Sequence, residues 1–296
     1  MDESFGHIPL LDAIDLDILM HKDAHFSGNF PLMIEYYENE GVGVMPDFDL
    51  DRIKELYEIE NSLGASLSES LLPLPARQMI DRSKKMYHDL RSVYEKKHDH
   101  VACSVSDLIL TEDEFPEKEI NELAKHGQKS YAAMIHIIES SDFYDPLFPG
   151  YGRTPIFAAI VLEHIKNPDA IKHLFSALGQ ENFFTDDAII KALVSFGQIS
   201  KDFLLKRLVS EPFTKENVYA ITALTTLEDD EEVAKVALML LHKKELQKNE
   251  NFSRYLIFAC SGLKHENDRL DFTQIKDSLS SSGLKRECDV IIKNWM

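Results

Sequence analysis

The sequence has no hydrophobic run long enough to cross a membrane as a helix. Its apolar stretches, such as residues 156–162, are far shorter than the roughly 20 residues that a spanning helix needs. The N-terminus begins Met1-Asp2-Glu3-Ser4 and lacks the basic stretch followed by an apolar one that marks a secretory signal. We therefore expect a cytoplasmic protein that does not insert into membranes, while export by a route that reads no N-terminal signal stays open.

Cysteine is scarce. The chain has three cysteines, Cys103, Cys260 and Cys288, and no two of them form a C-x-x-C pair. An odd number of widely spaced cysteines argues against a disulfide framework and against a thiolate zinc site. This pattern is typical of a protein from a reducing compartment.

Common catalytic motifs are also missing. The sequence contains no G-x-S-x-G and no H-E-x-x-H, so a nucleophile elbow and a metalloprotease helix are excluded. Residues 41–46 begin like a dinucleotide-binding fingerprint but end in Pro46 instead of glycine. Residues 127–130 lack the flanking glycines of a phosphate-binding loop. The sequence predicts no catalytic residue and no cofactor.

Two groups of possible metal ligands are incomplete. Four acids occupy positions 1, 3, 5 and 12 of a calcium-loop pattern, but the sixth position, which needs glycine for the turn, is Arg52. These acids are Asp47, Asp49, Asp51 and Glu58. His21 and His25 could face one metal ion on a helix, yet no further ligands follow at a suitable spacing. We predict no metal site, and read Asp47 as the cap of a helix.

Positive charge is in short supply, above all in the N-terminal half. The whole chain has a net charge of −19. Residues 1–150 contain 30 acidic and 13 basic residues, a net charge of −17, whereas residues 151–296 contain 21 and 19, a net charge of −2. An acidic surface repels phosphate backbones and anionic lipids. Nucleic acids and membranes are therefore not expected as partners.

A repeat of helix pairs is the clearest feature that is present. Apolar residues recur at a spacing of 31 in the C-terminal half. They form two series: Leu162, Leu193 and Leu224, and Ile165, Phe196 and Leu227. The pattern predicts helix pairs at 154–165 with 168–178, 185–196 with 200–209, 214–227 with 230–242, and 252–263 with 272–279, followed by a capping helix at 284–295.

With this spacing, and with runs such as residues 220–233, the segment of roughly residues 150–280 resembles the HEAT-like repeat family. The resemblance implies an all-α fold with a right-handed α-solenoid of HEAT-like helix pairs. Some proteins of similar architecture are enzymes. Deoxyhypusine hydroxylases hold iron with repeated His-Glu pairs, whereas this chain has only His265-Glu266, and HEAT-type DNA glycosylases need a basic concave face. Nothing in the sequence favours the third group, the phycobilin lyases.

Upstream of the repeats the sequence predicts an acidic helical region. Helical spacing is evident at 47–60 and 76–97, and shorter helices are expected at 101–110, 117–125 and 130–140. The first 46 residues are interrupted by glycine and proline, and we expect them to be irregular. The break around residues 144–155 places the domain boundary: an acidic helical region at 1–145 and a repeat region at 146–296.

The function most in keeping with this sequence is a noncatalytic scaffold or adaptor that binds a protein partner. In HEAT-like arrays the second helices line the concave side, and here they carry basic residues that could dock an acidic segment, although ordinary solvated faces would look the same. The predicted partner-binding residues are Lys172, His173, Lys206, Arg207 and Lys235, together with Phe148, Tyr151 and Arg153 at the junction, which could instead pin the loop. The alternative is a metal-dependent or small-molecule enzyme with its site in the N-terminal region.

Overall fold

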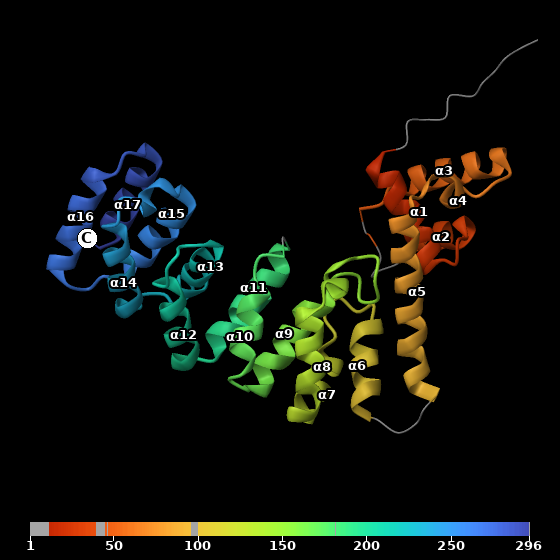
Figure 1. Ribbon diagram of the computed structural model, residues 1–296, viewed down its shortest axis with the longest axis horizontal. Coiled ribbons are helices and arrows are strands. Elements are labelled where there is room, and N and C mark those ends of the chain that lie inside the picture. Colours follow the sequence, from red (N-terminus) through yellow and green to blue (C-terminus); the bar gives the residue numbers. More distant parts are fainter. Residues whose placement is uncertain (1–11, 40–44, 46, 96–99, 181, 296) are drawn as a thin grey trace, which may run out of the picture. The chain divides into compact units, whose positions relative to one another are not determined.

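The protein is all-helical. The computed structural model describes residues 12–39, 45, 47–95, 100–180 and 182–295, and these residues form helices and no strand (Figure 1). This confirms the predicted all-α class. No helix in the described part of the chain combines the length and the apolar character needed to span a bilayer. The chain divides into two compact units, residues 1–165 and 166–296.

The first unit contains nine α-helices within the described residues. They are α1 (Ala13–His25), α2 (Phe30–Glu38), α3 (Leu50–Leu63), α4 (Leu67–Leu71), α5 (Leu74–Glu95), α6 (His100–Leu110), α7 (Glu117–His126), α8 (Gln128–Glu139) and α9 (Thr154–Ile165), with a short 3-10 helix η1 (Ser141–Tyr144). Helix α5 packs against α1 and against α6, and α6 to α9 pack on one another. Helix α5 therefore joins the N-terminal helices α1 to α4 to helices α6 to α9 (Figure 1).

The expectation that the first 46 residues are irregular is wrong, because α1 and α2 lie there. Asp12 caps α1 and forms a capping box with Asp15, and Asn29 caps α2. Helix α1 escaped prediction because its buried face includes the charged residues Asp15 and Lys22 as well as apolar ones. These two residues interrupt the apolar periodicity on which the prediction depended.

Ion pairs compensate for the burial of the charged groups of Asp15 and Lys22. The carboxylate of Asp15 accepts two hydrogen bonds from Arg52 on α3, at 2.7 and 2.6 Å, and the Arg52 guanidinium holds the pKa of Asp15 below its ordinary value. Lys22, of which 1% is exposed, lies 2.8 Å from Glu60 Oε2 and 4.5 Å from the ring centre of Phe30. The same Glu60 oxygen accepts a hydrogen bond from the backbone N–H of Leu67. These contacts tie α1 to α3 and to the start of α4.

The segment between η1 and α9 is pinned to α5. The Ser83 hydroxyl donates to the carbonyl of Leu147, Arg82 pairs with Asp142, and the Arg82 guanidinium lies over the ring of Phe148. Phe148 is 1% exposed and belongs to the hydrophobic core that α1 to α5 form. The loop therefore packs on the N-terminal helices.

The second unit consists of α10 (Ala170–Ser176), α11 (Phe183–Ser195), α12 (Gln198–Leu208), α13 (Lys215–Leu224), α14 (Glu231–Leu241), α15 (Glu250–Ala259), α16 (Glu266–Ser278) and α17 (Ser282–Asn294), with the 3-10 helices η2 (Leu246–Lys248) and η3 (Cys260–Gly262). Successive odd-numbered helices pack on each other, α11 on α13, α13 on α15 and α15 on α17, and α14 packs on α16. Even-numbered helices also pack on the helix that follows them, as α12 does on α13.

The predicted helices of the repeat region are confirmed, with most ends displaced by a few residues, while the helix predicted at 272–279 begins earlier, as α16 at Glu266. Helix α9 has the bounds expected for 154–165. Leu162, Leu193 and Leu224, which define the 31-residue spacing, are all fully buried. The predicted domain boundary at 145/146 precedes α9, whereas the compact units divide after it, because α9 packs on α7 and α8.

Candidate functional site

The first unit contains a cavity of about 440 Å³. It is lined by Ala24, His25, Phe26, Ser27, Tyr36, Lys84, Tyr87, His88, Arg91, Glu112 and Tyr151. These residues come from α1, α2, α5, the segment after α6 and the loop before α9. A volume of this size is within the range of small-molecule sites.

An aromatic cluster forms one wall of the cavity. The Tyr87 hydroxyl lies 3.0 Å from Nδ1 of His25, and Tyr87 also interacts with Tyr151. The His25 ring centre is 5.3 Å from that of Tyr151 and 5.1 Å from that of His21, whose ring is stacked on it. Contacts of His25, Tyr87 and Tyr151 thus connect α1, α5 and the loop before α9.

Burial keeps these aromatic groups uncharged. It lowers the pKa of His21 to about 3, with the neighbouring His25 as a second cause, and the pKa of His25 to about 4. Burial also raises the pKa values of Tyr87 and Tyr151. Nδ1 of His21 and Nε2 of His25 are buried and have no hydrogen-bond partner among the residues that the structure describes. The cluster is therefore a neutral, polar wall at neutral pH.

The loop before α9 places Tyr151 by an unusual backbone. Gly150, Tyr151 and Gly152 have φ angles of +90°, +53° and +75°. Tyrosine rarely adopts a positive φ, and such strain persists only where the surroundings impose it. A Cβ atom at position 152 would lie 2.9 Å from the carbonyl oxygen of Tyr144. The two glycines are therefore required for Tyr151 to reach the cavity.

Substitution Gly152→Ala is expected to lower the free energy of unfolding by about 2 kcal/mol, because it adds a backbone clash to the strain of a positive φ. Urea denaturation followed by circular dichroism would measure the change. Gly64→Ala is the matched control: Gly64 has a φ of +63° but open space around its Cβ position, so it should cost only about 1 kcal/mol. Equal losses in the two variants would contradict the contact with Tyr144.

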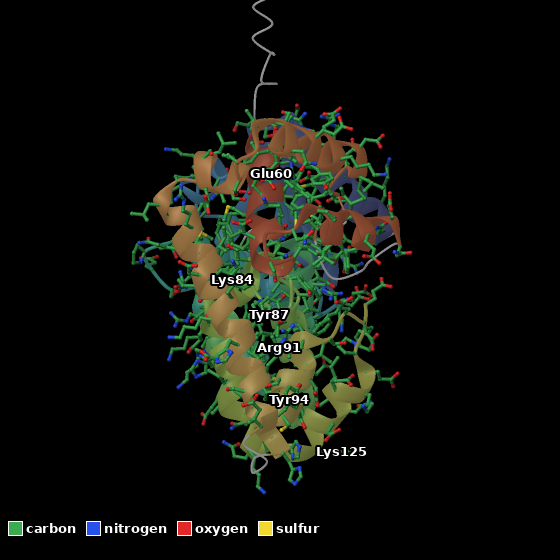
Figure 2. All side chains as sticks on the ribbon, turned by 90° about the vertical axis from the view of Figure 1, so that its right-hand side faces the viewer. Glu60, Lys84, Tyr87, Arg91, Tyr94 and Lys125 are labelled. Carbon is green, nitrogen blue, oxygen red and sulfur yellow. The ribbon has the colours of Figure 1, made fainter. Side chains whose placement is uncertain are left out.

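Three basic side chains of α5 line the cavity. Lys84, His88 and Arg91 are exposed and lie at helical positions i, i+4 and i+7, which share one face. Figure 2 shows Lys84, Tyr87 and Arg91 following one another along this helix. The guanidinium of Arg91 lies 5.8 Å from the ring centre of Tyr87. Lys84, His88 and Arg91 form no ion pair with a residue of the described part of the chain, and Glu112 is the acidic residue of the lining.

The three residues predicted at the junction have different positions. Tyr151 lines the cavity. The Arg153 guanidinium lies 5.9 Å from the Tyr151 ring centre and donates long hydrogen bonds to the carbonyls of Asp113 and Thr111. Phe148 is buried in the core, so its ring offers no surface to a partner.

The basic residues predicted in the second unit lie on α10, α12 and α14. Lys172 and Lys206 are exposed and His173 is half-buried. Arg207 lies 3.4 Å from Glu216 and stacks over Phe175 and Phe203, and Lys235 lies 2.7 Å from Glu231. Neighbouring acids of the same unit therefore neutralise part of the predicted positive surface.

The incomplete metal patterns have structural roles in the described residues. Asp49, not Asp47, caps α3, and the segment from Leu50 onward is helical, so the acids of the calcium-like pattern do not share a loop. His21 and His25 are stacked as part of the aromatic cluster. No group of three or more His, Cys, Asp or Glu side chains suited to a metal was found among the described residues. Residues 41–44 and 46 of the glycine pattern lie outside the described part.

A groove in the second unit was not predicted. It has a volume of about 400 Å³ and is lined mainly by α11, α13 and α15, including Phe183, Tyr219 and Tyr255. Phe183 and Phe184 at the start of α11 are 78% and 72% exposed. Their adjacency in the sequence was the available signal, but only the structure shows that both rings face outward.

Comparisons with known proteins gave no match: no family model, no curated protein and no solved structure matches this chain.

Proposed function

We propose that the protein is a noncatalytic scaffold or adaptor that binds a protein partner through its second unit. The packing of successive helix pairs supports this proposal, since odd-numbered helices contact odd-numbered ones along the unit. We infer from this packing and the 31-residue spacing a right-handed α-solenoid of HEAT-like pairs. Such arrays present an extended surface rather than a closed active site. We further propose that it acts in the cytoplasm and on protein rather than nucleic acid.

The observation that carries the proposal is the exposure of Phe183 and Phe184 beside the groove. Their ring centres are 5.7 Å apart, and Phe183 itself lines the groove. Large aromatic side chains next to a concave surface are frequent centres of binding energy. A partner that inserts an apolar side chain into the groove would bury both rings.

In this proposal, the predicted basic residues of the second unit affect the rate of association with the partner. Lys172 and Lys206 attract an acidic segment of the partner over a distance, which accelerates association more than it strengthens the complex. Arg207 and Lys235, which already pair with acids, contribute less. The aromatic pair accordingly determines affinity, and the basic residues determine the rate of association.

The double substitution Phe183→Ser/Phe184→Ser is expected to weaken partner binding by at least about tenfold, a loss of roughly 1.4 kcal/mol, because it removes two aromatic contacts. Crosslinking and pull-down from native lysate would identify the partner, and surface plasmon resonance would measure the affinity. Leu270→Ser, at an apolar residue of α16 that is 55% exposed and lies away from the groove, is the control.

A combined charge reversal of Lys172, Lys206, Arg207 and Lys235 is expected to slow association several-fold, and to leave dissociation nearly unchanged.

Unchanged binding of the Phe183→Ser/Phe184→Ser variant, or the same loss in Leu270→Ser, would contradict the proposed binding surface. A reproducible partner that contacts neither surface would contradict the scaffold function assigned to this unit.

The alternative function, an enzyme or small-molecule-binding protein with its site in the N-terminal region, is favoured by one observation. The cavity of the first unit gathers His25, Tyr87, Arg91 and Tyr151 from separate elements. Convergent polar groups in a concave site are typical of ligand-binding pockets.

A further inference from the structure

Two positive side chains that line the cavity of the first unit, Lys84 and Arg91, form no ion pair with a described residue, although this part of the chain is rich in acids. Residues 1–150 carry a net charge of −17. Some basic residues of this unit pair with acids: Lys22 pairs with Glu60, Arg52 with Asp15 and Arg82 with Asp142. Lys84 and Arg91 do not, although both line the cavity.

We propose that this cavity binds a small molecule that carries an anionic group on a planar ring. Lys84 and Arg91, with His88 between them, hold the anion, and the wall of His25, Tyr87 and Tyr151 contacts the ring. The site differs from the surface proposed for protein binding, and its occupancy does not depend on the scaffold function.

The basic side chains explain the preference for an anion. Their spacing along α5 puts Lys84, His88 and Arg91 on one helix face at the cavity. Hydrogen bonds from ammonium and guanidinium groups to an anion are about twice as strong as neutral ones. An anionic ligand would thus replace the counter-charge that the protein itself does not provide.

The aromatic wall explains the preference for a planar ring. The His25 ring centre lies 5.6 Å from that of Tyr87 in an edge arrangement and 5.3 Å from that of Tyr151 in a tilted one, and Phe26 and Tyr36 continue this wall. Aromatic rings prefer such offset and edge contacts with a further ring. Because His25 is neutral, it does not attract the anion away from Lys84 and Arg91, and the wall contacts the ring of the ligand.

Glu112 offers the ligand a hydrogen-bond acceptor. It is the acidic residue among those that line the cavity, and it lies near Tyr87 and Tyr151, since its charge contributes to raising both of their pKa values. A carboxylate repels the anionic end and accepts hydrogen bonds from a hydroxyl or amino group.

Isothermal titration calorimetry on the full chain tests the proposal with four probes. Phenyl phosphate and benzoate carry both a ring and an anion, inorganic phosphate has only the anion, and benzyl alcohol has only the ring. At least one ring-bearing anion is expected to bind with a Kd below about 1 mM, and at least about tenfold more tightly than either half-probe. Comparison of the Kd values of phenyl phosphate and benzoate shows whether the site prefers a phosphate or a carboxylate.

Variants locate the binding site. Arg91→Gln is expected to weaken binding of the better probe about tenfold, because a charge-assisted contact is lost. Lys85→Gln is the matched control, since Lys85 is an exposed residue of the same helix, with the same charge as Lys84, but does not line the cavity. Tyr151→Leu is expected to weaken the ring-bearing probe and to leave inorganic phosphate unaffected. Circular dichroism of each variant controls for the fold.

Three results would overturn the proposal. The first is that no ring-bearing anion binds with a Kd below about 1 mM. The second is that inorganic phosphate or benzyl alcohol binds as tightly as the best ring-bearing anion. The third is that Lys85→Gln loses as much affinity as Arg91→Gln, which would show a diffuse attraction to α5 and no site in the cavity.

Discussion

Acidification from about pH 7 to about pH 5 is expected to lower the free energy of unfolding by about 4 kcal/mol through His21 and His25 alone. Burial lowers their pKa values from the ordinary 6.5 to about 3 and about 4. Between pH 6.5 and these values the unfolded chain binds two protons that the folded protein excludes. Stability is therefore full above pH 6.5 and declines as the pH falls toward the folded pKa values.

Urea denaturation at a series of pH values measures this effect. His21→Leu and His25→Leu should each remove about half of the difference between pH 7 and pH 5, because each histidine accounts for about 2 kcal/mol of it. His88→Gln, which changes an exposed histidine of α5, should keep the full difference. A variant with both leucines that is still as acid-sensitive as the wild type would show that other groups cause the decline.

Replacement of Glu60 by glutamine is expected to lower the free energy of unfolding by about 3 kcal/mol. The ammonium group of Lys22 would keep its buried position but lose the carboxylate 2.8 Å away. Asp23 would remain at 3.8 Å, and 19% of the Glu60 side chain is exposed, which places the effect at the lower end of the range for a buried pair. The loss corresponds to a decrease in Tm of about 9 °C.

A double-mutant cycle separates this ion pair from the rest of the packing. Lys22→Met/Glu60→Gln should recover most of the stability, since it also removes the buried ammonium group that Glu60→Gln leaves without its carboxylate. Glu58→Gln, on the exposed face of the same helix, should change stability by less than about 0.5 kcal/mol. Equal effects of Glu58→Gln and Glu60→Gln would refute the role of the buried pair.

A helix could be predicted from the sequence where apolar residues recur regularly along one of its faces. Helix α5 and the helices of the repeats were predicted from their apolar spacing, because residues three and four apart share a face that neighbouring helices cover. Helix α1 was missed because Asp15 and Lys22 lie on its buried face, where Arg52 and Glu60 neutralise them. Those partners lie on α3, and so the local sequence of α1 contains no sign of them.

The candidate site was predictable only in fragments. Tyr151 and the pair His21 and His25 were identified as residues of interest, but for partner binding and for a metal. The spacing of Lys84, His88 and Arg91 is visible in the sequence, yet an ordinary solvated helix face has the same pattern. The cavity that they line also requires Tyr151, which is held by two glycines with positive φ angles.

The sequence by itself determined the all-helical class, the position of most helices and the contrast in charge between the two halves. These features follow from composition and from interactions between residues at most four positions apart. The tertiary structure alone decided which charged residues are buried and which side chains meet in the cavity. Contacts such as Lys22 with Glu60 and His25 with Tyr87 join residues 38 and 62 positions apart, and only the packing of whole helices brings them together.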